Sequence, residues 1–417
     1  MKVLMIALVQ SHLLPMVPTA WALQAAGHDV VLAGAGDVTE AGAAAGLSTI
    51  TVGREQAGFQ TWHRRVHDRT AAPGGPGGPG GPEASGTPDA PGPWADLAVA
   101  WRTRVAGVIE EYLGIAEAWK PDLVLTDPIE FCGLITGGVL GIPTVAHRWG
   151  PDAMETILRE PVRAALGDLC AGLGLRTGMP AADLIVDPCP PGLQVPGLAP
   201  ASPMRFVPYN GTGEIPQWTT RRATEERRIL VSLGRFGMKS VSDPGQDGWA
   251  VVRSLLAAVR DRGDTEVLLP VPAEARSGLG PVPDGVRVID PVPLSKVLRT
   301  CDAVVHHGGT GSALTATWAG LPQLALPLAH PALIGCAQRI AATGAGIALT
   351  EPERQGDPDE LRAALAAVLE EPEYREGAVR LREEMRTQPS LAAVVGELEQ
   401  LEAGSANRRE RRLACAS

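Results

Sequence analysis

Residues 304–314 read VVHHGGTGSAL, a short apolar run that leads through two histidines and a turn of small residues into a helix near Ser312. Backbone N–H groups gather at the N-terminus of a helix, and the helix dipole favours an anion there. Glycines let a phosphate come close to the backbone. Ser312 can add a hydroxyl donor and His307 an imidazole N–H. The segment predicts a diphosphate cradle, with an ordinary strand–helix turn and a buried histidine as the alternative.

Two better-known phosphate motifs do not describe the chain. GxxxxGK[ST] does not occur in it. In GxGxxG the third glycine would follow Gly309 and Gly311, but Leu314 stands there, and in the similar stretch at 34–39 Thr39 takes that place. The prediction therefore depends on the turn at 304–314 and on its surroundings.

Apolar runs alternate with helical patterns on both sides of this turn, which predicts parallel sheets with crossover helices. One helix is expected to begin near Pro15, because proline suits a first helical turn. The expected fold class is α/β, with two Rossmann-like doubly wound domains that face each other across a cleft. The expected strands cover residues 2–9, 29–33, 47–52, 122–126, 143–147, 204–209, 229–233, 266–269, 286–289, 303–306, 323–326 and 346–349.

Changes in composition suggest the domain boundaries. Residues 71–93 are rich in proline and glycine and predict a disordered surface loop, because they cannot bury apolar area. The expected organisation is an N-terminal domain over 1–210, a linker over 211–225, a C-terminal domain over 226–375, helices over 376–404 that pack back on the N-terminal domain, and a basic tail over 405–417.

Composition and charge argue against several classes of protein. The 417 residues include 37 basic and 47 acidic ones, and a net charge of −10 does not suit an electrostatic nucleic-acid binder. Six irregularly spaced cysteines without a CxxC pair argue against a disulfide framework or a zinc site, and they fit a reducing cytoplasm. No apolar stretch approaches the roughly 18–20 residues that span a bilayer. The short apolar run near the start predicts a first strand rather than a signal peptide.

Several further stretches carry a family resemblance. They are SHLLPMVPTAWALQAAGHDV (11–30), HRWGPD (147–152), DPCPPGLQVPG (187–197), MRFVPYNGTG (204–213), LVSLGRFG (230–237), DPVPLSKVL (290–298) and HHGGTGSALTATWAGLPQLALP (306–327). Together they resemble the GT-B glycosyltransferases that attach deoxysugars to natural products in actinobacteria, among them macrolides, aromatic polyketides and enediynes. The resemblance covers essentially the whole chain outside the Pro/Gly loop.

This resemblance implies an inverting transfer of a deoxysugar from a dTDP-sugar co-substrate, without a metal or another cofactor. It implies that the N-terminal domain holds a hydrophobic aglycone and that the C-terminal domain holds the nucleotide sugar. Ser232 and Gly234 would approach the diphosphate from the first turn of that domain, and Val292 would use its backbone on the nucleobase. The cradle residues carried over by position are His307, Gly309, Thr310, Gly311 and Ser312.

A general base is needed because a hydroxyl is a poor nucleophile at neutral pH. His12 lies just beyond the first expected strand, where open α/β sheets place ligands, and the family's base occupies this position in many members. Asp127 ends another expected strand and could hold the imidazole in the right tautomer. Glu130 and Asp152 are reserve carboxylates. In the structural alternative, His12 only starts a helix and Asp127 only forms a turn before a proline.

At the acceptor site and the sugar site, this chain differs from the family's usual residues. Ser11 stands where the family often has glycine, and with Trp94 and Trp149 it is assigned to the acceptor site, although core packing also explains the two tryptophans. Many relatives carry an acidic residue and a glutamine where this chain has LAHPA at 328–332. Either the donor is a polydeoxygenated sugar or the chain has lost donor turnover, and apolar lining favours the first because buried hydroxyls would go unpaired. His330 could still supply one hydrogen bond to the sugar.

Two functions from different classes follow. The first is deoxysugar transfer to a polyketide or enediyne aglycone, with His12 as base and Asp127 as its partner. The alternative is a non-catalytic GT-B-like protein that binds a sugar nucleotide or activates another transferase. The expected partners are the aglycone and the nucleotide sugar, with neither nucleic acid nor a membrane span, and a homodimer stays open.

Overall fold

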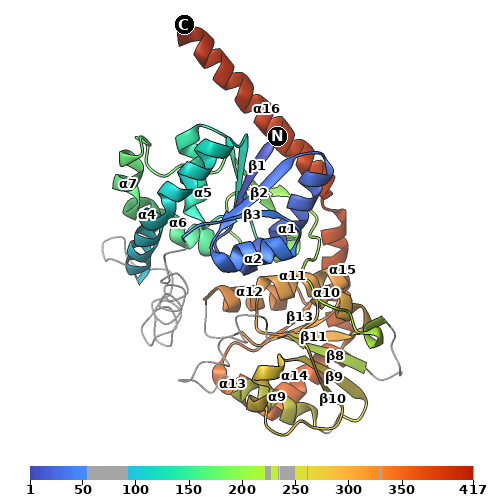
Figure 1. Ribbon diagram of the computed structural model, residues 1–417. Helices are drawn as coiled ribbons and strands as arrows, with labels where there is room; N and C mark the ends of the chain where they lie inside the picture. The colour runs from blue at the N-terminus through green and yellow to red at the C-terminus, as the bar shows by residue number, and fades with distance from the viewer. Residues whose placement is uncertain are drawn as a thin grey trace.

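The computed structural model describes residues 1–53, 93–220, 227–232, 234, 249–260, 262–327 and 331–416. They form two α/β domains, one above the other in Figure 1, each built on a parallel sheet with helices on both faces. The predicted loop at 71–93 lies outside the described residues, except for Pro93, which begins a helix.

The first sheet has the strand order β3-β2-β1-β4-β5-β6-β7, and every adjacent pair is parallel. Its strands are β1 (Lys2–Ile6), β2 (Asp29–Gly34), β3 (Ser48–Thr51), β4 (Leu123–Thr126), β5 (Thr144–His147), β6 (Leu184–Asp187) and β7 (Ser202–Pro203). The helices of this half are α1 (Gln10–Ala25), α2 (Gly36–Ala44), α4 (Pro93–Trp119), α5 (Phe131–Leu140), α6 (Met154–Ala165) and α7 (Gly167–Gly172), with the 3-10 turns η1 (Pro191–Leu193) and η2 (Gln217–Thr220).

The second sheet has the order β10-β9-β8-β11-β12-β13 and is also parallel throughout. Its strands are β8 (Arg227–Ser232), β9 (Thr265–Pro270), β10 (Val286–Ile289), β11 (Ala303–His306), β12 (Gln323–Ala325) and β13 (Gly346–Ala348). The remaining elements are α9 (Ala250–Val259), η3 (Ala273–Gly278), α10 (Leu294–Val297), η4 (Leu298–Thr300), α11 (Thr310–Ala319), α12 (Pro331–Ala342), α13 (Pro352–Gly356), α14 (Pro358–Glu370), α15 (Pro372–Thr387) and α16 (Leu391–Ala416).

Strand β1 shows why these apolar runs become central strands. Val3 and Met5 belong to the hydrophobic cluster on one face of the sheet, while Leu4 and Ile6 belong to the cluster on the other. All four side chains are fully buried. Burial on both faces explains a continuous apolar run in place of alternation, as expected where crossover helices cover a parallel sheet.

The two domains share a hydrophobic interface. Cys189, Leu193 and Phe206 of the first half pack with Ala313 and Leu314 of α11 in one buried cluster. Helix α15 contributes to the same cluster, and α16 then lies against α1 of the first domain (Figure 1). The residues predicted as a tail continue α16 as far as Ala416.

Two local predictions were wrong, and one strand was missed. The helix expected near Pro15 begins at Gln10, because the Val9 carbonyl already accepts the N–H groups of His12 and Leu13. The helix continues through its two prolines. Because it begins at Gln10, His12 lies in its first turn. This places the candidate base on a helix rather than in the loop that precedes it.

The strand expected over 204–209 is replaced by the two-residue β7, which ends at Pro203. The Arg205 N–H donates to the carbonyl of Pro389, so the backbone leaves the sheet and joins the segment before α16. Strand β6, over Leu184–Asp187, was missed because its short apolar run stops at a proline-rich stretch. Pairing with β5 and β7 on its two sides holds it in the sheet.

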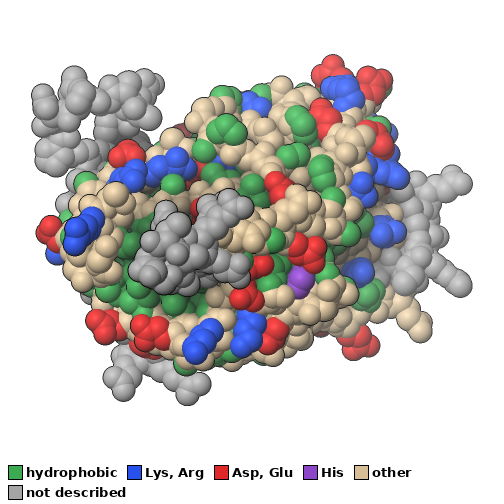
Figure 2. All heavy atoms as spheres, turned by 90° about the horizontal axis from the view of Figure 1, so that it is seen from above, with side chains coloured by type: hydrophobic (Ala, Val, Ile, Leu, Met, Phe, Trp, Pro, Cys, Tyr) green, Lys and Arg blue, Asp and Glu red, His purple; other side chains and the backbone are tan. Residues whose placement is uncertain are grey.

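Charges of both signs are mixed on the surface. On the face seen in Figure 2, Lys and Arg side chains are interspersed with Asp and Glu, so the described side chains there form no patch of one sign. In the part of the chain that the structure describes, no helix combines the length and apolarity needed to cross a bilayer.

Candidate functional site

Both sheets reverse their strand order at a central pair of strands, β1 and β4 in the first and β8 and β11 in the second. In open α/β sheets, ligands bind beyond the carboxyl ends of the strands at such a switch point. His12 follows β1 and Asp127 follows β4, while Ser232 ends β8 and His307 follows β11. The two residues assigned to catalysis and two of those assigned to the donor therefore lie at the switch points.

At the first switch point, His12 Nδ1 lies 3.4 Å from Asp127 Oδ2. The Asp127 side chain is completely buried, and its carboxylate accepts the Leu8 N–H at Oδ2 (2.7 Å) and the Ile129 N–H at Oδ1 (3.1 Å). These bonds fix the carboxylate beside the imidazole. The contact lacks hydrogen-bond geometry, because the buried Nδ1 of His12 has no hydrogen-bond partner among the described residues. A neutral ring protonated at Nδ1 has its lone pair at Nε2, and the His12 side chain is 15% exposed.

The Trp149 indole stacks on His12, with ring centroids 3.9 Å apart and planes inclined by 6°. Its Nε1–H donates to Asp152 Oδ2 at 3.1 Å, and Asp152 Oδ1 accepts the Met154 N–H at 2.7 Å. Burial raises the pKa of the Asp152 carboxyl. The reserve carboxylate Asp152 is thus engaged in holding the indole over the imidazole, a contact that the sequence analysis missed.

Trp149 itself is 5% exposed, so most of its surface is covered within the protein. The preceding residue anchors the loop, since the Arg148 guanidinium donates to Glu155 at 2.6 and 2.8 Å and to Asp187 at 3.1 Å. The structure therefore gives Trp149 a contact with the candidate base, and a contact with the acceptor stays a prediction.

The other reserve carboxylate, Glu130, has a different partner. Its side chain is fully buried and forms a two-pronged ion pair with Arg104 of α4. It also accepts the Cys132 N–H at the start of α5. Breaking a buried pair of this kind leaves an uncompensated charge. Glu130 is therefore committed to holding α4 against the loop that carries Asp127.

At the second switch point, α11 begins at Thr310 with Gly309 as its N-cap, and no side chain caps it. The Ala313 N–H bonds to the Gly309 carbonyl, as the first intrahelical bond should. Among the described residues, the N–H groups of Thr310, Gly311 and Ser312 have no hydrogen-bond acceptor. A diphosphate is the kind of ligand that suits three such donors.

The His307 ring lies between two glycines. A Cβ placed on Gly234 or on Gly309 would overlap the imidazole, so neither position can carry a side chain without moving the ring. Burial lowers the pKa of His307 to about 4, so the ring is neutral at pH 7. Nδ1 lies 3.4 Å from the Ser232 carbonyl, and a neutral ring that donates there has its lone pair at Nε2. A donor role for Nε2 toward phosphate would require the other tautomer or a second proton.

His306 shapes the turn from behind. Its Nδ1 accepts the Gly308 N–H at 3.1 Å, and its Nε2 lies 3.0 Å from Gln323 Oε1. Gln323 in turn donates to Thr317 of α11 at 3.2 Å. Burial lowers the pKa of His306 to about 3, so the ring keeps the lone pair that Gly308 needs. Gly308 has a φ of 83°, in the left-handed region that favours glycine.

The two switch points meet through one loop. A Cβ on Gly150 would lie 2.9 Å from Thr310 Cβ and 3.2 Å from Leu314 Cδ1. The residue after Trp149 therefore rests directly on the first turn of α11. His12, the indole, Gly150 and the uncapped helix end form one continuous series of contacts across the domain interface.

The remaining predicted residues are placed as follows. Ser11 is exposed in the first turn of α1, and Ser232 Oγ lies 3.4 Å from Ser312 Oγ. Val292 is partly buried and packs against the cluster that includes Leu294. The side chain of Trp94 and the whole of His330 lie outside the described residues.

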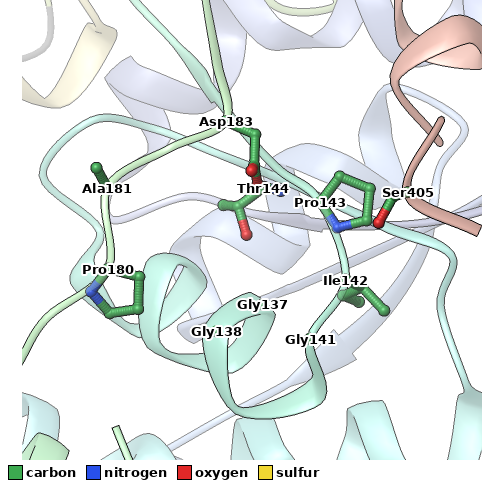
Figure 3. A pocket seen from close by; sticks show the side chains of 10 residues that line it. All are labelled: Gly137, Gly138, Gly141, Ile142, Pro143, Thr144, Pro180, Ala181, Asp183 and Ser405. Carbon is green, nitrogen blue, oxygen red and sulfur yellow. Dashed lines mark hydrogen bonds between the residues drawn. The ribbon is translucent and has the colours of Figure 1, made fainter. Parts of the chain in front are cut away.

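One pocket belongs to a different region. It encloses about 300 Å³ beneath the C-terminal end of α5, and Figure 3 shows Thr144, Asp183 and Ser405 among its lining residues. Thr144 is the first residue of β5, so this pocket lies at the amino edge of the sheet, opposite the switch point. Within the described ranges, no group of three or more His, Cys, Asp or Glu side chains is gathered as metal ligands.

Comparison with known proteins identifies the family of this chain. The model of the erythromycin biosynthesis protein CIII-like N-terminal domain matches residues 98–234, and that of the C-terminal domain matches residues 253–401. The 3-alpha-mycarosylerythronolide B desosaminyl transferase of Saccharopolyspora erythraea is 33% identical over 95% of this chain and 96% of its own length. The chain belongs to the EryCIII-like family of glycosyltransferases. The TDP-daunosamine transferase DnrS of Streptomyces peucetius is 33% identical over 97% of both chains.

A solved structure extends the match to three dimensions. The spinosyn rhamnosyltransferase SpnG has a TM-score of 0.81 and 33% identity over 96% of this chain and 100% of its own. SpnG has also been solved with thymidine diphosphate and with the spinosyn aglycone. The predicted family, the GT-B fold and the assignment as a glycosyltransferase are confirmed.

Proposed function

We propose that this chain transfers a deoxysugar from a dTDP-sugar to a hydrophobic polyketide-type aglycone, with inversion at the anomeric carbon and with no other cofactor. The relatives named as desosaminyl and daunosamine transferases support the class of sugar. The SpnG structures with thymidine diphosphate and with an aglycone support the two substrates.

On the acceptor side, His12 acts as the general base. As the acceptor oxygen attacks the anomeric carbon, its proton passes to Nε2, and the negative charge of Asp127, 3.4 Å from Nδ1, stabilises the imidazolium. The face of the Trp149 indole lies against the same ring and favours its cationic form. The bond from the anomeric carbon to the diphosphate breaks with its electron pair, and displacement from the opposite side inverts the configuration.

On the donor side, the N–H groups at the start of α11 receive the diphosphate. As the sugar leaves, negative charge grows on the phosphate oxygens, and preorganised amide dipoles at a helix N-terminus stabilise such charge. The hydroxyls of Ser232 and Ser312 lie beside this helix end. Neutral donors therefore carry the stabilisation, which is why the transfer is proposed to proceed without a metal.

A single observation carries the proposal. The His12–Asp127 pair and the uncapped start of α11 lie at facing switch points, joined through Trp149 and Gly150, which rests on Thr310. A sugar attached to a diphosphate on α11 would therefore lie next to the base. A protein that only binds a sugar nucleotide has no need of a histidine beside a buried carboxylate at this place.

The test uses the reverse reaction and one variant. The purified chain, incubated with dTDP and a panel of glycosylated macrolides and anthracyclines, should release an aglycone that mass spectrometry detects. His12→Ala should lower the rate about a hundredfold or more and leave the dissociation constant of dTDP unchanged. His28→Ala is the matched control, because His28 bonds to Met1 and Glu399 away from the site. Equal rates for His12→Ala and wild type would remove His12 as the base.

A further inference from the structure

Asn210, in the segment that follows β7, bonds with two separate helices of the second domain. Its Oδ1 accepts the Ser295 N–H of α10 at 2.9 Å, and its Nδ2 donates to Thr315 Oγ1 of α11 at 3.0 Å. The amide orientation is fixed because a backbone N–H must face the oxygen. One side chain from the end of the first domain thus joins the two helices.

The contact with α10 is a cap supplied from a distant part of the sequence. Helix α10 begins at Leu294, directly after the turn that contains Val292, and its N-cap Pro293 makes no side-chain capping bond. Ser295 is buried, so its N–H would lose a partner without the Asn210 oxygen. Asn210 therefore fixes the start of the helix that follows the proposed nucleobase turn.

The contact with α11 reaches the proposed diphosphate site. Thr315 is fully buried, and its hydroxyl donates to the Gly311 carbonyl at 2.6 Å while it accepts from Asn210. Gly311 belongs to the first turn of α11, whose N–H groups are proposed to receive the diphosphate. The Asn210 amide is thus connected, through one hydroxyl, to the turn that carries the cradle.

The linker backbone follows the same route. Gly211 has a φ of 93°, which turns the chain in a way that favours glycine. A Cβ on Gly213 would lie 3.3 Å from Pro293 Cδ, so the linker passes against the nucleobase turn. The position of Asn210 therefore depends on backbone packing as well as on its two hydrogen bonds.

We propose that Asn210 is a positioning residue that fixes the separation between the nucleobase turn and the diphosphate helix. This inference rests on the proposed function, which assigns those two subsites. A nucleoside diphosphate binds both subsites at once. Binding at one subsite increases the affinity at the other only when the two subsites are already at the correct spacing. Asn210 sets that spacing from the residue before the linker and touches neither the base nor the phosphate.

The test compares the binding of dTDP, which uses both subsites, with the binding of thymidine and of inorganic pyrophosphate. In the full chain, Asn210→Ala should raise the dissociation constant of dTDP by about tenfold in calorimetry, the scale of one to two lost net hydrogen bonds. The dissociation constants of thymidine and of inorganic pyrophosphate, followed by NMR titration, should stay within about twofold of wild type, because each ligand uses one subsite only.

Two variants at the other end of the bridge serve as controls. Thr315→Val removes the hydroxyl but leaves the Ser295 cap in place, and it should weaken dTDP by about threefold without affecting thymidine. Thr315→Ser keeps the hydroxyl and should bind dTDP as wild type does. Unchanged dTDP binding in both Asn210→Ala and Thr315→Val would overturn the inference, as would equal losses for thymidine and dTDP in Asn210→Ala. If wild-type protein bound no dTDP, the proposed donor itself would be contradicted.

Discussion

Gly311→Ala is expected to weaken the binding of dTDP at the cradle while it stabilises the fold. Gly311 is exposed in the first turn of α11, and a Cβ placed on it has no atom within 4 Å. Alanine is a better helix former than glycine, so the variant should gain about 0.5 kcal/mol in free energy of unfolding. The Cα–Cβ bonds of a helix tilt toward its N-terminus, so the new methyl group would point toward the proposed diphosphate position.

The expected loss in binding follows from that geometry. If the methyl group keeps the diphosphate from one charge-assisted amide bond, roughly 1.5–3 kcal/mol is lost, so the dissociation constant of dTDP should rise by about tenfold or more. Gly396→Ala in α16 is the matched control, because its Cβ also meets nothing within 4 Å. Calorimetry with dTDP and urea unfolding measure the two effects. If Gly311→Ala bound dTDP as tightly as Gly396→Ala, the diphosphate could not lie on these amides.

Three further predictions concern the rings at the site. Trp149→Leu should lower kcat about tenfold with dTDP binding unchanged, while Trp149→Phe keeps a stacked ring and most of the activity; equal rates would show that the ring is dispensable. Gly234→Ala should displace His307, lower the melting temperature and weaken dTDP about tenfold, and a wild-type melting curve would contradict the packing. His306 and His307 stay neutral in the fold, with pKa values of about 3 and 4, while the unfolded chain protonates both near pH 6.5. Stability should therefore fall as the pH drops from about 6.5 toward 4, by up to about 1.4 kcal/mol per pH unit for each histidine, and His306→Asn should reduce that slope in urea unfolding.

The sequence predicted best those features that depend on the order of strands and loops along the chain. The apolar runs indicated the central strands, and chain connectivity then put His12 after β1 and the HHGGTG turn after β11. Because the carboxyl ends of parallel strands share one edge, Asp127 could be expected near His12 before any coordinates were known. The helix start at Gln10 was missed because Pro15 was interpreted as a first-turn residue, whereas buried apolar contacts carry α1 through both prolines.

Contacts between distant residues could not be predicted in the same way. Nothing in the local pattern indicates that Trp149 stacks on His12, because that contact requires the loop after β5 to fold over the loop after β1. Asn210 stood in a quoted motif, but its partners lie 85 and 105 residues further along the chain. Such contacts depend on how two domains pack, and the hydrophobic pattern of one segment carries no information about the other.

A crystal of the full chain soaked with dTDP tests the central claim most directly. Phosphate oxygens should lie within hydrogen-bond distance of the N–H groups of Thr310, Gly311 and Ser312, with the free end of the diphosphate directed toward His12. A diphosphate bound elsewhere, or a start of α11 whose amides point at protein atoms in the complex, would contradict the account.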